Sequence, residues 1–176
     1  MDSQQLLQLS DEHYGLLFDV RRSIRYHDRR RAFYERSHHL TSLLTILMAD
    51  SVLFDLAKKG ETAEWLIWVS VVAALLAAID MVIGYAKHAS LHSSLRERFA
   101  NLEIEIVCGP ADGDCWLGYQ KERLLIEKYE PAIYRALDGL CRNELLVAEG
   151  FSQKDDSNHF FKSWFWQRWT SQLFRW

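Results

Sequence analysis

The sequence contains little proline and little glycine, the two residues that most often interrupt helices. There are two prolines and eight glycines in 176 residues, and several long stretches repeat apolar residues every three or four positions. This composition argues against a turn-rich fold and predicts a nearly all-α protein. Cysteine is also scarce: Cys108, Cys115 and Cys141 form an odd number and give no disulfide framework.

Signatures of the common enzyme classes are missing as well. There is no P-loop, no GxSxG turn, no HExxH motif and no glycine-rich dinucleotide turn. His88 and His92 stand four residues apart and could share a helix face, but no second pair has a recognisable metal-ligand spacing. We therefore predict a protein that is not an enzyme and that has no cofactor and no metal site.

Two long apolar runs are the strongest positive signal. They cover residues 37–57 and 65–86 and are separated by a polar turn at 58–64. Each run is about 20 residues long, enough to cross a hydrocarbon layer of roughly 30 Å at 1.5 Å per residue. The residues before them lack the basic and then apolar layout of a cleaved signal sequence. The sequence therefore predicts a transmembrane hairpin.

The distribution of basic residues predicts how this hairpin is oriented. Seven arginines precede the first run, and Lys87, Arg96 and Arg98 follow the second, whereas the turn carries two lysines against two glutamates. Basic residues near the ends of membrane spans stay in the cytoplasm. Both termini are therefore predicted to be cytosolic.

Aspartates interrupt both runs, Asp50 and Asp55 in the first and Asp80 in the second. A carboxylate costs roughly 2.5–3.5 kcal/mol at the centre of a spanning helix, so these side chains are expected to avoid lipid. In a symmetric assembly of copies, each would form a ring of carboxylates, which favours cations in channels. A structural alternative is that each acid is protonated or accepts a hydrogen bond from a nearby hydroxyl. The hydroxyls in reach are those of Thr45, Ser51 and Ser70.

The second run also carries a stripe of small side chains. Its members share one face of a helix and are Ser70, Ala73, Ala77, Asp80 and Gly84. Small residues let helix backbones approach closely within a membrane. We expect the stripe to face other helices or a central lumen. The candidate intramembrane polar residues are Asp80, Asp50, Asp55, Ser70 and Thr45.

Helical patterns continue on both sides of the hairpin. In residues 87–107 the apolar side chains recur at intervals of three and four, at Leu91, Leu95, Phe99, Leu102 and Ile106. Further helices are predicted over 116–130 and from Pro131 to Gly150. The predicted organisation is an N-terminal cytosolic helix (1–36), the hairpin (37–86), a cytosolic helical bundle (87–150), and a linker with a C-terminal helix (151–176).

The C-terminal tail is unusually aromatic. Residues 159–176 hold four of the seven tryptophans and three basic residues, without an acid. Read as a helix, this tail would suit the headgroup region of a membrane or packing between subunits. The same composition suits single-stranded nucleic acid, whose bases stack on aromatic rings while cations meet phosphates. Trp169, Arg168 and Arg175 are the tail residues that we predict to contact such a ligand.

Arginines at helical spacing before the first run form a second candidate ligand surface. Arg21, Arg25, Arg29 and Arg36 could hold phosphates through charge-assisted hydrogen bonds. The alternative is topological: these residues would fix the cytosolic side and meet anionic lipid.

Three parts of this layout together resemble a known family. A segment at 25–34 (RYHDRRRAFY), two spans with a short turn, and a segment at 86–92 (AKHASLH) followed by Phe99 and Leu102 are similar to the SLATT-type two-transmembrane effectors of bacterial anti-phage systems. The resemblance covers roughly residues 20–107. It implies a homo-oligomeric pore in the bacterial inner membrane whose opening arrests growth, controlled by the product of an adjacent nucleotidyltransferase. Among such effectors, the Hailong type, a tetrameric channel held shut by a short deoxyadenylate strand, is the best match in size.

The sequence thus leads us to expect a membrane ion channel of several copies, gated by a nucleotide or short single-stranded oligonucleotide. Two alternatives remain open. The hairpin could only tether a cytosolic binding module to membrane lipids, or the chain could be a soluble helical protein that binds single-stranded nucleic acid through its tail.

Overall fold

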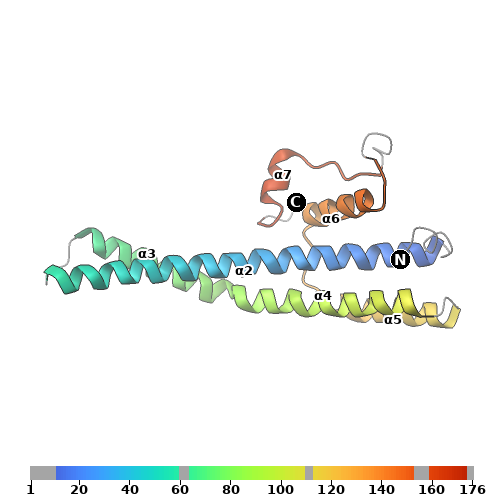
Figure 1. Cartoon of the computed structure of the whole chain (residues 1–176), viewed down its shortest axis with the longest axis horizontal. Helices are drawn as coiled ribbons and strands as arrows, with labels where there is room; N and C mark the ends of the chain where they lie inside the picture. Colours follow the sequence, from blue (N-terminus) through green and yellow to red (C-terminus); the bar gives the residue numbers. More distant parts are fainter. Residues whose placement is uncertain (1–10, 60–63, 110–112, 153–158, 174–176) are drawn as a thin grey trace. The chain divides into compact units, whose positions relative to one another are not determined.

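The structure, a computed structural model, describes residues 11–59, 64–109, 113–152 and 159–173, with 11–12, 56–59 and 113–114 described in backbone only. These residues form helices and no strand, which confirms the predicted all-α class. The helices are α2 (Asp11–Lys59), α3 (Glu64–Ile83), α4 (Tyr85–Cys108), α5 (Gly113–Glu127), α6 (Arg135–Ala148) and α7 (Phe165–Thr170) (Figure 1).

Helix α2 is uninterrupted over 49 residues. The boundary predicted at residues 36 and 37 therefore does not coincide with a break in the backbone. No glycine or proline lies between Gly15 and Gly60, so no residue in this stretch disfavours helix strongly. One continuous helix carries both the arginine-rich segment and the first apolar run.

The second apolar run continues almost directly into the next helix, with Gly84 as the only residue between α3 and α4. Gly84 has a φ of +66°, in the left-handed region that favours glycine. Helical hydrogen bonds continue on both sides. The Gly84 N–H donates to the Asp80 carbonyl at 2.8 Å, and the His88 N–H donates to the Gly84 carbonyl at 3.1 Å.

The chain divides into two compact units. We call residues 31–91 the hairpin unit and the described residues of 11–30 and 92–173 the helical body. In the hairpin unit, α3 runs back along α2 (Figure 1). His38 on α2 lies 3.0 Å from Asp80 on α3, and the Tyr34 ring stacks on that of His88 with 5.0 Å between centroids. These two contacts show that α2 and the returning helices run antiparallel within the unit.

In the helical body, α2 contacts three other helices through ion pairs. Arg21 reaches Glu103 of α4 at 2.7 Å, Asp19 accepts from Arg123 of α5 at 2.9 Å, and Arg22 reaches Asp138 of α6 at 3.2 Å. The apolar stripe predicted on 87–107 is largely buried here. Its buried members are Leu95, Phe99, Leu102 and Ile106. The core also takes in Leu16, Leu17, Val20, Ile126, Leu137, Cys141 and Leu145.

The limits of α6 test two predictions. Gly150 ends the helix as expected: it has a φ of +95°, its N–H donates to the Val147 carbonyl, and the Phe151 N–H donates to that of Leu146. The start was predicted wrongly, because α6 begins at Arg135 and Pro131 lies outside it. The Tyr134 N–H donates to the Tyr26 hydroxyl at 3.1 Å, a bond to α2 that holds the preceding residues in a non-helical conformation.

The prediction of a continuous C-terminal helix is also wrong. Within the described residues 159–173, the α-helix is limited to Phe165–Thr170, and residues 161–164 are not helical. The reason lies in two hydrogen bonds at 2.8 Å between the Asn143 side chain and the backbone N–H and carbonyl of Phe161. These bonds use backbone groups that a helix would need. Residues 153–158 of the predicted linker, the turn residues 60–63, and Arg175 lie outside the described residues.

Candidate functional site

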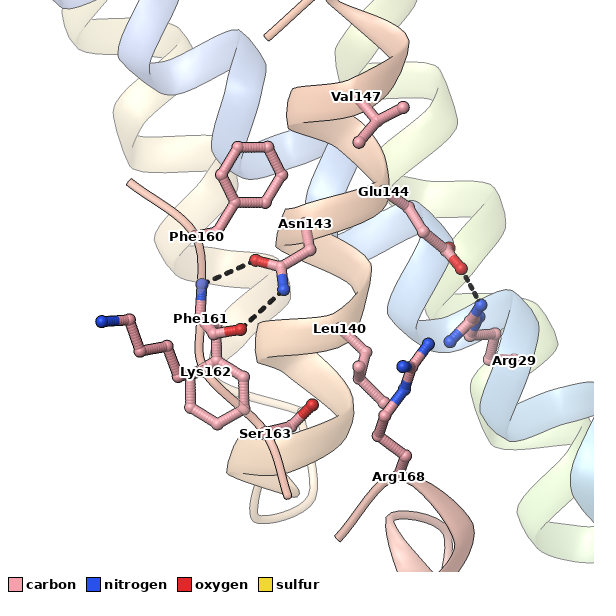
Figure 2. Close-up of a pocket in the computed structure, with 10 residues that line it drawn as sticks. All are labelled: Arg29, Leu140, Asn143, Glu144, Val147, Phe160, Phe161, Lys162, Ser163 and Arg168. Atoms are coloured by element: carbon pink, nitrogen blue, oxygen red, sulfur yellow. Dashed lines mark hydrogen bonds and ion pairs between the residues drawn. The ribbon is translucent and has the colours of Figure 1, made fainter. Parts of the chain in front are cut away.

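Residues 160–163, which precede α7, pack on α6 and form one side of a cavity. Asn143 fixes Phe161 through both backbone hydrogen bonds, and Phe160 is buried beside it (Figure 2). Gly139 makes room for the Phe161 ring, since a Cβ there would lie 2.5 Å from a ring carbon. The segment is therefore held to α6 by matched hydrogen bonds and by close packing.

This packing leaves a partly open cavity of about 660 Å³ in the helical body. Its lining comes from α2, α6 and the C-terminal segment: Arg29, Leu140, Asn143, Glu144, Val147, Phe160, Phe161, Lys162, Ser163 and Arg168. We call this site the basic cleft. Its volume is within the range of small-molecule sites, and most of its lining residues are polar or charged.

The charges of the basic cleft favour an anion. Arg29 forms an ion pair with Glu144, whereas Lys162 and Arg168 form no ion pair within the described part of the chain. In Figure 2 the Arg168 side chain extends between Leu140 and Arg29, and Lys162 points away on the far side of the segment. Two guanidinium groups and one carboxylate thus meet in the cleft, and Lys162 adds a positive charge at its edge. Two arginines whose guanidinium groups can each make two parallel hydrogen bonds suit a phosphate or a carboxylate.

Helix α7 presents aromatic rings beside Arg168. Trp164, Phe165, Trp166 and Trp169 are all exposed, and Trp169 retains 77% of its accessible surface. The Trp164 N–H donates to the Gln167 side chain at 3.0 Å, which caps the start of the helix. Exposed indole rings are available for stacking on a nucleobase or for the headgroup region of a membrane.

The basic cleft brings together some of the predicted ligand residues and not others. Arg29 of the arginine series and Arg168 of the tail both line it. Arg21 is instead paired with Glu103, and Arg25 donates to the Arg21 carbonyl at 3.3 Å. Arg36 is exposed in the hairpin unit. The expected ridge is therefore divided: an acid of α4 occupies Arg21, Arg25 bonds to its own helix, and Arg36 belongs to the hairpin unit.

A buried polar network within the helical body was not predicted from the sequence. His27 Nδ1 lies 2.9 Å from His92 Nδ1, and His27 Nε2 lies 2.9 Å from a Glu130 carboxylate oxygen. Phe99 stacks on the His27 ring at 5.6 Å. With His27 Nε2–H donating to the carboxylate, neutral His27 accepts at Nδ1 from His92. His92 follows Leu91 and lies on the same side of α4 as the apolar stripe, which is the one sequence signal of its position. Its burial, which distinguishes it from a surface histidine, is seen only in the structure.

Arg30 was missed as an anchor of the C-terminal segment. It is buried, its guanidinium donates to the Gln172 carbonyl at 2.7 Å, and it stacks over the Tyr134 ring at 4.1 Å. Burial raises the pKa of the neighbouring Tyr26 hydroxyl. Arg30 sits in a run of three arginines, and nothing local distinguishes the buried member from its neighbours.

The candidate intramembrane residues differ in their surroundings. Asp80 faces His38 within the hairpin unit, while Asp50 is exposed and Asp55 is half-buried. The hydroxyls considered as partners donate instead to their own helices. Thr45 donates to the Thr41 carbonyl at 2.8 Å, and Ser51 and Ser70 each donate to the carbonyl three residues earlier at 2.7 Å.

Helix α3 with its continuation, Glu64–Cys108, contains a stretch long and apolar enough to cross a membrane, and only 11% of that stretch is buried. Among the described residues it is the one helix with such a stretch. The first apolar run ends at residue 57, beyond the last described side chain of α2. No cluster of three or more potential metal ligands occurs within the described ranges.

No family model, curated protein or solved structure matches this chain. The resemblance to SLATT-type effectors therefore stays a prediction from the residue pattern.

Proposed function

We propose that this chain forms a gated ion-conducting pore from several copies in a bacterial inner membrane, with both termini in the cytosol. The pore would act as an anti-phage effector that arrests growth when open. A nucleotide or short single-stranded oligonucleotide, supplied by an adjacent nucleotidyltransferase, would control it. The anti-phage setting, the tetramer and the enzyme partner rest on the resemblance, whereas the pore and the anionic ligand draw support from the geometry.

The apolar surface of the hairpin unit is the observation that carries the proposal. Large apolar side chains on both helices are exposed, including Leu40, Leu43, Ile46, Leu47, Leu53, Phe54, Trp65, Ile67, Trp68, Leu75, Met81 and Val82. Soluble proteins rarely expose contiguous apolar patches beyond a few hundred Å². Lipid and further copies of the chain would both remove this surface from water. A soluble nucleic-acid-binding protein is therefore the weaker alternative.

Polar residues on the same unit support a pore rather than a tether. A tether needs only apolar helices, but α2 carries Asp50 among exposed leucines. A carboxylate at the bilayer centre costs roughly 2.5–3.5 kcal/mol, so intramembrane acids usually mark ion pathways.

The basic cleft supports control by an anion. A phosphorylated ligand there would meet Arg29 and Arg168, and the exposed rings of α7 offer stacking surfaces for bases. Helix α2 continues from Arg29 into the hairpin unit, so one element belongs to both the ligand site and the pore.

Reconstitution of the purified full chain into liposomes tests the pore directly. We expect potassium flux that depends on protein density, together with release from cell membranes only by detergent. Flux no higher than in empty liposomes would contradict the proposal. Toxicity on expression in bacteria should parallel the flux.

Binding of a fluorescent deoxyadenylate strand to the full chain in detergent tests the ligand. Arg168→Gln should weaken binding roughly ten- to hundredfold, the loss of one or two charged hydrogen bonds. Arg135→Gln is the matched control, because Arg135 is exposed on α6 and does not line the basic cleft. Equal effects of the two substitutions would exclude the cleft as the site.

A further inference from the structure

The two helices of the hairpin unit contact each other along complementary seams. On α2 the half-buried positions recur at intervals of three and four, at Tyr34, His38, Thr41, Thr45, Met48, Val52 and Asp55. On α3 the buried or half-buried positions are Leu66, Val69, Ala73, Leu76 and Asp80. Seams with this spacing are those of paired helices. Asp80 therefore points toward α2, where His38 is its partner.

The faces opposite these seams differ in chemistry. The outer face of α3 is apolar, with Trp68, Val71, Leu75 and Val82 exposed. The outer face of α2, which we call the outer stripe, consists of Arg36, His39, Leu43, Ile46, Asp50 and Leu53, all of them exposed. At 100° per residue Asp50 lies opposite the seam position between Met48 and Val52. The outer face of α3 is thus suited to acyl chains along its length, whereas that of α2 holds a carboxylate at mid-span.

Among the residues that the structure describes, Asp50 has no partner that would allow it to face lipid. It forms no hydrogen bond or ion pair within the described part of the chain, in contrast to Asp80. Arg36 on the same stripe is about 21 Å away along the helix at 1.5 Å per residue, too far for an ion pair, which needs a nitrogen–oxygen distance of about 4 Å or less.

We infer that the outer stripe of α2 lines the conduction pathway, with α3 facing lipid, and that Asp50 rather than Asp80 determines its selectivity for cations. This inference rests on the proposed pore. Copies arranged with α2 innermost would bring their Asp50 carboxylates into one ring in contact with water. Asp80 would remain a contact within each subunit.

Reversal potentials in a potassium chloride gradient test the role of Asp50. Asp50→Asn should lower the permeability of potassium relative to chloride several-fold, Asp50→Glu should preserve it, and Asp80→Asn should leave the ratio unchanged. The opposite ranking, with Asp80→Asn lowering the ratio and Asp50→Asn neutral, would overturn the inference.

Labelling by a charged, water-soluble thiol reagent gives a second readout in the same liposomes. In a Cys108→Ser, Cys115→Ser background, Leu43→Cys and Ile46→Cys should react, whereas Val71→Cys and Leu75→Cys should not. Conductance without labelling of the outer stripe would refute the inference alone. Absence of conductance in the unmodified chain would instead refute the proposed function, and the inference with it.

Discussion

The hairpin unit and the helical body place apolar side chains in opposite environments. In the body, Leu17, Phe99 and Leu137 are at most 1% exposed. In the hairpin unit, Trp68 and Val82 retain 72% and 80% of their accessible surface. Segments of the same two helices, α2 and α4, occur in both units. The helical body is therefore stabilised by its own core, whereas the hairpin unit depends on its surroundings to remove its apolar side chains from water.

Truncating one aromatic residue in each unit should give the largest difference between the units in the free energy of unfolding. Phe99→Ala removes a fully buried ring stacked on His27 and should lower the free energy of unfolding by about 3–5 kcal/mol. Trp68→Ala removes an exposed ring and should change it by less than about 0.5 kcal/mol in detergent. Urea unfolding followed by circular dichroism measures both. Similar losses for the two variants would mean that the hairpin has a core of its own.

Two glycine substitutions in the helical body should change its stability in opposite directions. Gly139→Ala places a Cβ 2.5 Å from the Phe161 ring and should destabilise by about 1–3 kcal/mol through overpacking. Gly118→Ala, in α5 with no neighbouring atom within 4 Å, should stabilise by about 0.5–1 kcal/mol. Thermal unfolding distinguishes the signs. Gly139→Ala should also weaken ligand binding at the basic cleft, and unchanged binding would separate the Phe161 packing from the site.

The cysteines should report the same distinction between interior and surface. Burial raises the pKa of the Cys141 thiol to about 12, while Cys108 is exposed. A thiol reagent at pH 8 should therefore modify Cys108 rapidly and Cys141 only after unfolding. Mass spectrometry of the modified peptides measures both rates. Comparable rates would show that the core of the body opens readily.

The raised pKa of Cys141 also predicts how stability depends on pH. The unfolded thiol ionises near 8.5, whereas the folded thiol keeps its proton to about 12. The folded state then binds more protons across this range, so the free energy of unfolding should fall as pH rises through it. Cys141→Ala should reduce that slope, in chemical unfolding compared at pH 8 and pH 10.5. An unchanged slope would assign the effect to other groups.

Local patterns in the sequence were sufficient for the helices but not for their long-range contacts. The spacing of Leu95, Phe99 and Leu102 predicted a buried stripe on α4, and Gly150 predicted the end of α6. These features depend on residues within a few turns of one another. The start of α6 was missed because a hydroxyl on α2, that of Tyr26, fixes Tyr134.

The same limit applies to the basic cleft and to the buried histidines. Arg29 and Arg168 could be named as phosphate ligands from their charge, but only the fold places both in one cavity. Arg21 and Arg29 look alike in the sequence, and each is paired with an acid more than 80 residues further along, Glu103 and Glu144, but only Arg29 lines the cleft. His27 and His92 form a pair only because two distant helix faces meet. Contacts between distant segments decide which equivalent side chains are available.

The single residue Gly84 makes the two sides of the hairpin unit unequal. Helix α2 has no glycine or proline from Arg31 to Lys59, so no residue on this side favours a break in the helix. The returning side passes Gly84, whose left-handed backbone conformation a residue with a side chain rarely adopts. A continuous rod therefore lies beside a jointed one, and the joint depends on a residue without a Cβ.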